Sequence, residues 1–193
     1  MTLNNFQFNT TPGLRFGSGE AKNSCKEIFN KLGSRILFIT DKGLMSLGLT
    51  KPTIQELKTM GEVEVFDGVE ADPSKKTLLT AIEIGKKFKA TGVIGFGGGS
   101  SMDVAKLTAL ILGSNEDLEK AWGVANAKGP RLPLALVPTT AGTGSEVTPV
   151  SIITVGEEEK KRSFFSNNFT RFSNFRSKSY IRSSSWNYGS NRN

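Results

Sequence analysis

Short apolar runs recur along most of the chain, and each run ends in turn-forming residues. Five of them have the length and the Val, Ile, Leu and Phe content that is typical of β-strands. These predicted strands cover residues 35–40, 62–66, 91–97, 132–140 and 150–154. The run at 62–66 alternates glutamate with apolar residues, which predicts a strand near an edge of the sheet.

Between these runs, apolar residues recur at helical spacing. The predicted helices cover residues 20–32, 51–60, 73–89 and 101–112. Alternating strands and helices predict the α/β class, with a Rossmann-like, doubly wound and mostly parallel sheet. Because ligands of such sheets bind beyond the carboxyl ends of the strands, we expect functional residues in the loops that follow the strands.

The first such loop, ITDKG at 39–43, places Asp41 directly after a predicted strand. A carboxylate there can accept hydrogen bonds from a ribose diol, and its charge repels a 2′-phosphate. Aspartate is also a preferred N-cap residue, and for Asp41 taken alone the cap is the better interpretation.

The second loop, VIGFGGGSSMDVAK at 93–106, joins a predicted strand to a helix. Consecutive glycines let backbone N–H groups approach a ligand, and the helix start adds a positive partial charge. This favours a phosphate, although the spacing matches neither G-x-G-x-x-G nor the Walker motif. The alternative is a plain glycine turn with Ser101 as the N-cap and Asp103 in the first helical turn.

The third loop, VPTTAGTGSEVTPV at 137–150, is rich in hydroxyl residues and glycine. Its hydroxyls can donate to phosphate and ribose oxygens, or they can belong to a solvated Ser/Thr loop. Because two phosphate-compatible loops each follow a strand, we expect one diphosphate ligand to be held from two sides.

The pair GGGSSMDVAK and PTTAGTGSEVT resembles the iron-containing (group III) alcohol dehydrogenase family, over about residues 6–161. The resemblance implies a dehydroquinate-synthase-like N-terminal domain that binds NAD(P) and a C-terminal helical domain that holds Fe²⁺ or Zn²⁺. It also implies hydride transfer between NAD(P) and a small alcohol or aldehyde, whose oxygen the metal polarises. Family members often assemble, so a homo-oligomer is compatible with this sequence.

The resemblance further implies roles for individual residues. Asp41 would contact the adenosine ribose and favour NAD, with NADP left open. Gly98, Gly99 and Ser100 would hold the pyrophosphate, with Asp103 beside them. Thr139, Thr140, Thr143 and Thr148 would line the nicotinamide side, and Lys161 would contact a ribose.

The chain has no histidine and a single cysteine, Cys25. This composition excludes a Ser-His-Asp triad, a Cys-His pair and a His-ligated metal within the chain. The metal-binding aspartate and histidines of the family, which belong to its helical domain, are absent here, so we expect no dehydrogenase turnover by this chain alone. The absence of a signal-like N-terminus and of an apolar run of about 20 residues predicts a cytoplasmic protein without a membrane segment.

Residues 162–193 carry six of the 25 basic residues and none of the 18 acidic ones, so they hold nearly all of the net charge of +7. A segment so rich in Ser, Asn and Arg is expected to be disordered. With suitable codons, Asn168–Asn193 read one base onward give TLPDLAILDPNLTLGLPAGITAATGI, followed by the first two bases of an Asp codon. Family members continue in this way up to their first metal-binding carboxylate. We therefore predict an NAD(P)-binding domain at 1–161 and an out-of-frame tail at 162–193, after a slip near codons 160–165.

Two other functions remain open at this point. The domain could be a nucleotide-binding module without catalysis, if it folds in the absence of a helical partner domain. Alternatively, the basic, aromatic tail could track a single-stranded nucleic acid. Charge clusters of this kind are more often solvated tails, so we expect neither a nucleic acid nor a membrane as a partner.

Overall fold

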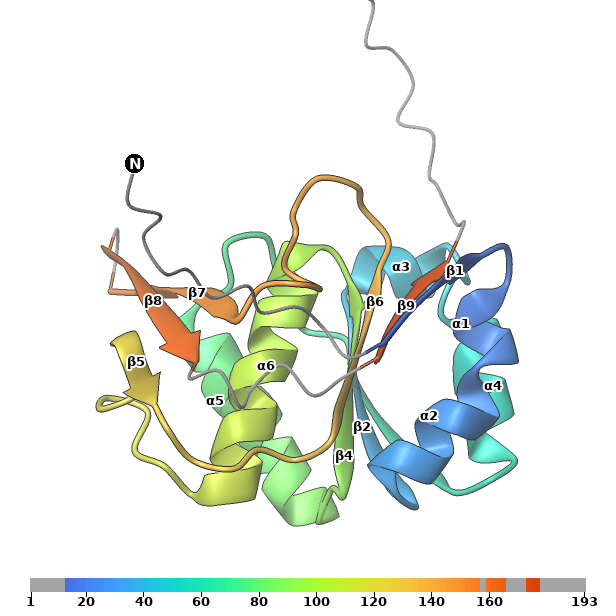
Figure 1. Cartoon of the computed structure of the whole chain (residues 1–193), viewed down its shortest axis with the longest axis horizontal. Helices are drawn as coiled ribbons and strands as arrows, with labels where there is room; N and C mark the ends of the chain where they lie inside the picture. The colour runs from blue at the N-terminus through green and yellow to red at the C-terminus, as the bar shows by residue number, and fades with distance from the viewer. Residues whose placement is uncertain (1–12, 157–158, 166–172, 178–193) are drawn as a thin grey trace, which may run out of the picture.

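A central parallel sheet organises the computed structural model, which describes residues 13–156, 159–165 and 173–177 (Figure 1). The strand order is β1-β9-β6-β4-β2-β3, and every neighbouring pair is parallel. The strands are β1 (Gly13–Gly17), β2 (Arg35–Ile39), β3 (Glu62–Phe66), β4 (Gly92–Gly97), β6 (Leu134–Pro138) and β9 (Ser173–Ser177). The predicted parallel α/β fold is thus confirmed, and β3 lies at an edge as its alternating pattern predicted.

Helices cover both faces of this sheet (Figure 1). One face carries α1 (Glu20–Asn23), α2 (Cys25–Leu32), α3 (Lys42–Ser46) and α4 (Lys51–Lys58), and the other carries α5 (Lys75–Phe88) and α6 (Gly99–Ser114). Strand β2 serves both cores, because Ile36 and Phe38 join the cluster with α2 and α4 while Leu37 joins the cluster with α5 and α6. This alternation on a fully buried strand explains why its sequence is apolar throughout.

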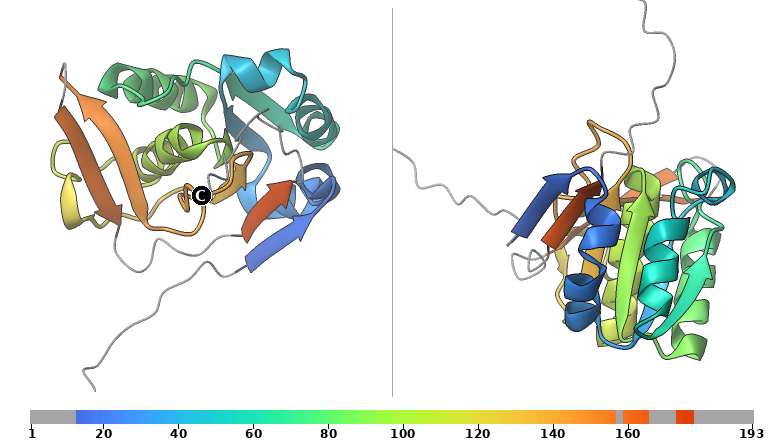
Figure 2. Two further views of the ribbon diagram at one scale, coloured as in Figure 1. Left: turned by 90° about the horizontal axis from the view of Figure 1, so that it is seen from above. Right: turned by 90° about the vertical axis from the view of Figure 1, so that its right-hand side faces the viewer.

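Helix α6 is enclosed between two sheets (Figure 2). Every residue from Ser101 to Ile111 is buried. Its outer side is covered by a small sheet of order β5-β8-β7, formed by β5 (Gly123–Ala127), β8 (Glu159–Phe165) and β7 (Val150–Val155). The predicted strand at 150–154 is therefore present but lies outside the main sheet. The segment between β6 and β7 contains no helix that could cross the sheet, and a parallel neighbour needs such a crossover.

Other elements differ from the sequence prediction at particular points. The helix predicted at 20–32 is interrupted at Ser24, which separates α1 from α2. Helix α3 and strands β1 and β5 had no clear pattern in the sequence. Strand β9 and most of β8 lie within residues 162–193, where we expected disorder. Within the described ranges, no helix combines the length and apolarity needed to cross a membrane.

The order of the strands creates a crevice between β2 and β4. From β2 the chain moves outward to β3, and it then returns past β2 to β4. The helices that follow β2 lie on one face of the sheet, whereas α6, which follows β4, lies on the other (Figure 1). Chains that diverge in this way leave an opening at the carboxyl ends of the two strands, where ligands of doubly wound sheets bind.

Candidate functional site

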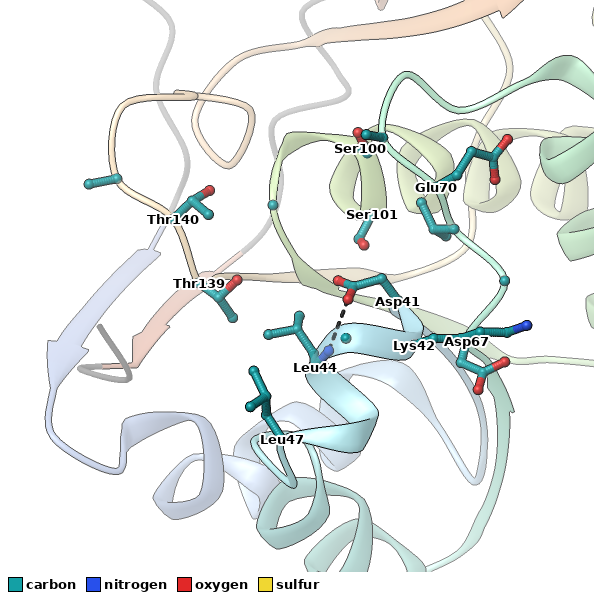
Figure 3. A pocket seen from close by; sticks show the side chains of 16 residues that line it. Asp41, Lys42, Leu44, Leu47, Asp67, Glu70, Ser100, Ser101, Thr139 and Thr140 are labelled. Carbon is teal, nitrogen blue, oxygen red and sulfur yellow. Dashed lines mark hydrogen bonds between the residues drawn. The ribbon is translucent and has the colours of Figure 1, made fainter. Parts of the chain in front are cut away.

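A cavity of about 1020 Å³ lies at the carboxyl ends of four adjacent strands (Figure 3). Its wall comes from the loops after β2, β3, β4 and β6. The lining residues are Asp41, Lys42, Gly43, Leu44, Leu47, Asp67, Gly68, Val69, Glu70, Ala71, Gly98, Ser100, Ser101, Thr139, Thr140 and Ala141. The fold thus brings together five residues that the sequence singled out, namely Asp41, Gly98, Ser100, Thr139 and Thr140.

Asp41 both caps a helix and lines the cavity. Its Oδ1 accepts a hydrogen bond of 2.9 Å from the Leu44 backbone N–H at the start of α3 (Figure 3). The N-cap interpretation of Asp41 is therefore confirmed. The two interpretations are compatible, because a carboxylate has two oxygens and the cap uses only Oδ1.

The start of α6 forms a second wall of the cavity. Its N-cap is Gly98, not Ser101, and no side chain caps the helix. Gly97 has φ of +152°, and a Cβ there would meet Ser101 Oγ at 2.7 Å. Glycine is therefore required at 97 to turn the strand directly into the helix. Uncapped N–H groups at a helix start, together with the helix dipole, favour an anion.

The glycine-rich loop and the threonine-rich loop face each other across a short gap. A Cβ on Gly98 would lie 3.6 Å from Thr140 Oγ1, and one on Gly99 would lie 3.5 Å from Thr143 Cβ. Both loops leave the paired strands β4 and β6, and the Thr139 N–H donates to the Gly97 carbonyl at 2.9 Å. The two loops therefore share one crevice, as we expected of a ligand held from two sides.

Two carboxylates that the sequence analysis did not identify as site residues complete the wall. Asp67 and Glu70 come from the loop after β3 and lie on the side of Asp41 away from the threonines (Figure 3). Partial burial acts to raise the pKa of Glu70, but hydrogen bonds from Thr77 and Ser74 outweigh it and hold that pKa below its ordinary value. Glu70 is therefore anionic at neutral pH, and this end of the cavity is acidic.

Four predicted site residues do not line this cavity. Gly99 lies near Thr143, since a Cβ on Gly99 would be 3.5 Å from the Thr143 Cβ, and neither these two residues nor Asp103 and Thr148 are among the lining residues. Asp103 accepts hydrogen bonds from Ser145 Oγ and the Ile152 N–H, and it pairs with the buried Lys106. The side chain of Lys161, a further predicted contact, lies outside the described residues.

The described residues do not fit a metal centre. No group of three Asp, Glu, Cys or His residues that could hold a metal occurs among them. Cys25 is buried against α4, and burial raises the pKa of its thiol from 9.0 to about 12. A thiol so difficult to ionise is a poor metal ligand and a poor nucleophile.

Comparison with known proteins shows to which family this chain is similar. A sequence model of the iron-containing alcohol dehydrogenases matches residues 12–171. The sulfoacetaldehyde reductase of Bilophila wadsworthia is 34% identical over 146 residues, which cover 75% of this chain and 38% of that protein. The choline dehydrogenase of Bacillus subtilis is 39% identical over 152 residues, which cover 77% of this chain and 38% of that protein.

Solved structures show the same similarity. An iron-containing alcohol dehydrogenase superposes with a TM-score of 0.82 at 31% identity, and the match covers 94% of this chain and 50% of that one. The sulfoacetaldehyde reductase of Bifidobacterium kashiwanohense, solved with NAD⁺, gives a TM-score of 0.77 at 29% identity, over 89% and 46% of the two chains. The chain spans less than half the length of the curated relatives described above.

Proposed function

Because the chain belongs to the iron-containing alcohol dehydrogenase family, we propose that its α/β domain binds a nicotinamide dinucleotide in the cavity beyond β2, β3, β4 and β6. The observation that carries this proposal is the shared crevice between Gly98–Ser101 and Thr139–Thr143. A helix start faces hydroxyl side chains there, and both can donate hydrogen bonds to a diphosphate.

The lining residues suggest how the dinucleotide lies in the cavity. The adenosine end would lie near Asp41, where Leu47 is 62% exposed and offers an apolar surface to the adenine ring. The pyrophosphate would lie against Gly98 and Ser100, and the nicotinamide side would lie toward Thr139 and Thr140. Contacts of the dinucleotide with Gly99, Thr143, Thr148, Asp103 and Lys161 stay predictions from the family resemblance.

We propose NAD as the preferred form of the cofactor. Three carboxylates, Asp41, Asp67 and Glu70, line the cavity at the end where we propose the adenosine to lie, and Lys42 is the one cationic residue among the lining residues. A 2′-phosphate would add negative charge close to these carboxylates, whereas a ribose diol can donate hydrogen bonds to one of them. The acidic rim therefore favours NAD over NADP.

For the whole protein we propose hydride transfer between the dinucleotide and a small alcohol or aldehyde. The similarity to an alcohol dehydrogenase, a choline dehydrogenase and a sulfoacetaldehyde reductase supports this reaction class. The bound dinucleotide supplies the hydride chemistry, and this chain's residues bind and orient it. No step is assigned to a metal, because the described residues do not fit one. We expect no turnover by this chain alone.

We also propose that residues 162–193 are translated out of frame. The shifted sequence sets Ala-Ile-Leu-Asp-Pro at the positions of Ser173–Ser177, and this segment forms β9 between β6 and β1. An apolar Ala-Ile-Leu run is typical of an interior strand of a parallel sheet, whereas Ser-Asn-Phe-Arg-Ser is not. The position of β9 therefore supports the interpretation that a strand of the family lies at these codons in another frame.

Titration of the purified chain with NADH, followed by the fluorescence of the reduced nicotinamide, tests the proposed function. We expect saturable binding that NAD⁺ competes away and that AMP also weakens. A folded chain, as judged by circular dichroism, that shows no saturable change with NADH would contradict the proposal. Binding of single-stranded DNA by the full chain but not by residues 1–161 would instead favour the nucleic-acid alternative.

A further inference from the structure

A buried ion pair lies on α6, the helix whose first residues line the cavity. Asp103 and Lys106 occupy the second turn of α6, and the Lys106 side chain is 1% exposed. Lys106 Nζ lies 3.2 Å from Asp103 Oδ1 and donates to the Thr148 carbonyl at 3.3 Å and the Val150 carbonyl at 2.5 Å. The ammonium group therefore holds one carboxylate and two backbone carbonyls at the same time.

Asp103, the carboxylate of the pair, contacts the same segment of the chain that Lys106 contacts. Asp103 Oδ1 accepts from Ser145 Oγ at 2.6 Å, and Oδ2 accepts from the Ile152 N–H at 3.0 Å. The pair therefore fastens the chain from Ser145 to Ile152 onto α6. This segment directly follows the threonines that face Gly98 and Gly99.

The threonine-rich loop is joined to β4 by the Thr139 N–H, and the N–H groups of Val147 and Thr148 form a turn with the Gly144 carbonyl. Residues 139–149 contain no helix or strand, and a Cβ on Gly142 or Gly144 would meet nothing within 4 Å. Burial of the ammonium group lowers the pKa of Lys106, an effect that the charges of Asp103 and Glu146 oppose. A buried pair of this kind adds little net stability, and its best-attested use is to specify one arrangement of the chain.

We propose that Asp103 and Lys106 are positioning residues that hold the 139–149 loop against the start of α6, so that Thr140 and Thr143 face Gly98 and Gly99. This inference rests on the proposed function of the cavity. Neither side chain of the pair lines the cavity. It acts through Ser145 and through the backbone of Thr148, Val150 and Ile152. The family resemblance predicts Asp103 beside the pyrophosphate, and its contacts with Ser145 and Ile152 support a positioning role in addition.

Hydrogen–deuterium exchange of the full chain without ligand tests whether Asp103 and Lys106 hold the 139–149 loop, independently of cofactor binding. Ser145→Ala removes one hydrogen bond, and Lys106→Met removes the ammonium group while keeping the apolar stem. We expect faster exchange across residues 141–152 in both variants, by about tenfold for Ser145→Ala because one buried hydrogen bond is lost. The matched control is Thr108→Val on the same helix, whose buried hydroxyl has no hydrogen-bond partner among the described residues. It should leave exchange in the loop unchanged.

Paired titrations with NADH and AMP test the link to the cofactor. AMP reports on the adenosine end near Asp41, whereas NADH also needs the loop. We expect Ser145→Ala to raise the Kd for NADH by about tenfold and the Kd for AMP by no more than about twofold. A merely structural role would change both dissociation constants together, in proportion to the unfolded fraction. Thr108→Val should change neither constant.

The outcomes separate this inference from the proposed function. If the natural chain fails to bind NADH, the proposed function fails. Faster exchange of the loop in Ser145→Ala would then still show that the contacts of Asp103 and Lys106 hold the loop in place. If the loop exchanges at the natural rate in a folded Ser145→Ala chain, or if the two dissociation constants rise together, the positioning role is overturned. Should Lys106→Met not fold, Ser145→Ala decides the matter.

Discussion

Gly95 on β4 lies directly beneath Ala105 on α6: a Cβ atom on Gly95 would fall 2.7 Å from the Ala105 Cβ. The same atom would lie 3.0 Å from Leu136 Cδ2 and 3.2 Å from the Met102 Cα. Helix α6 therefore packs so closely on β4 that only the Ala105 methyl group separates the two backbones at this point. This contact sets the height of α6 above the sheet, and with it the position of the uncapped helix start at the cavity.

Substitution Gly95→Ala should lower the free energy of unfolding by about 1–3 kcal/mol, because the added methyl overpacks a filled interface. Urea denaturation followed by circular dichroism measures the change. The Met102 backbone cannot yield without moving α6, so we also expect weaker NADH binding by the folded variant. Unchanged stability would mean that the helix can lift from the strand freely.

Gly98→Ala adds the same methyl group as Gly95→Ala, but at the cavity and not in the packed interface. Gly98 has φ of −76°, which any residue adopts, and its nearest neighbours would be Thr140 atoms at 3.6 and 3.9 Å. Stability should change by less than about 0.5 kcal/mol. Because the methyl would occupy the space that a phosphate needs against the backbone, we expect the Kd for NADH to rise about tenfold or more. An unchanged Kd would remove Gly98 from the binding site.

Two substitutions at Asp41 separate its two roles. Serine is as good an N-cap as aspartate but carries no charge, whereas Asp41→Ala loses the cap at a cost of about 1 kcal/mol. Both variants should gain affinity for NADPH relative to NADH, and only Asp41→Ala should lose stability. Titrations with the two cofactors, together with thermal unfolding, check this. If Asp41→Ser binds the two cofactors in the natural ratio, Asp41 acts as a helix cap only.

The buried thiol of Cys25 predicts a pH dependence of stability. Its folded pKa is about 12 against 9.0 for an ordinary thiol, so the folded chain keeps a proton that the unfolded chain loses. The stabilising contribution is complete below pH 9.0 and is lost as the pH rises toward about 12. Denaturant titrations at about pH 8 and about pH 10.5 should show a smaller decline in Cys25→Ala than in the natural chain. Equal declines in the two proteins would contradict the assignment.

DNA sequencing through codons 160–165 and beyond the stop codon tests the proposed slip. We expect a single-base insertion or deletion there, relative to a continuous frame that encodes TLPDLAILDP and then a helical domain with histidines. An intact frame on both sides of Lys161, with no such sequence in the shifted frame, would refute the proposal.

Local pattern was sufficient for those parts of the fold that depend on neighbouring residues. The charged alternation at 62–66 identified an edge strand, and the loops after β2, β4 and β6, where we expected functional residues, line one cavity. The acidic wall was missed because Asp67 and Glu70 reach Asp41 only through the pairing of β2 with β3. No spacing in the sequence reveals which strand becomes a neighbour.

The role of Asp103 depends on contacts that are even more distant in sequence. Its partners Ser145 and Ile152 lie 42 and 49 residues away. Family resemblance predicts this carboxylate beside a ligand because it follows the glycines, but no spacing in the sequence reveals its hydrogen bond to Ile152 in β7. The separate sheet of β7 was missed for a related reason, since an apolar run predicts a strand but not the sheet that it joins.

Among the described residues, strand β6, which is buried along its whole length, pairs with β9 only at Leu136 and Asn174, whereas β9 pairs with β1 at five positions. We therefore expect β1 and β9 to separate from β6 together, before the rest of the sheet opens. Their departure would bare the backbone edge of an apolar strand, which is a template for pairing with other copies. We therefore expect the purified protein to aggregate through the exposed edge of β6, as fibres or amorphous precipitate, under conditions in which its hydrophobic core is still folded.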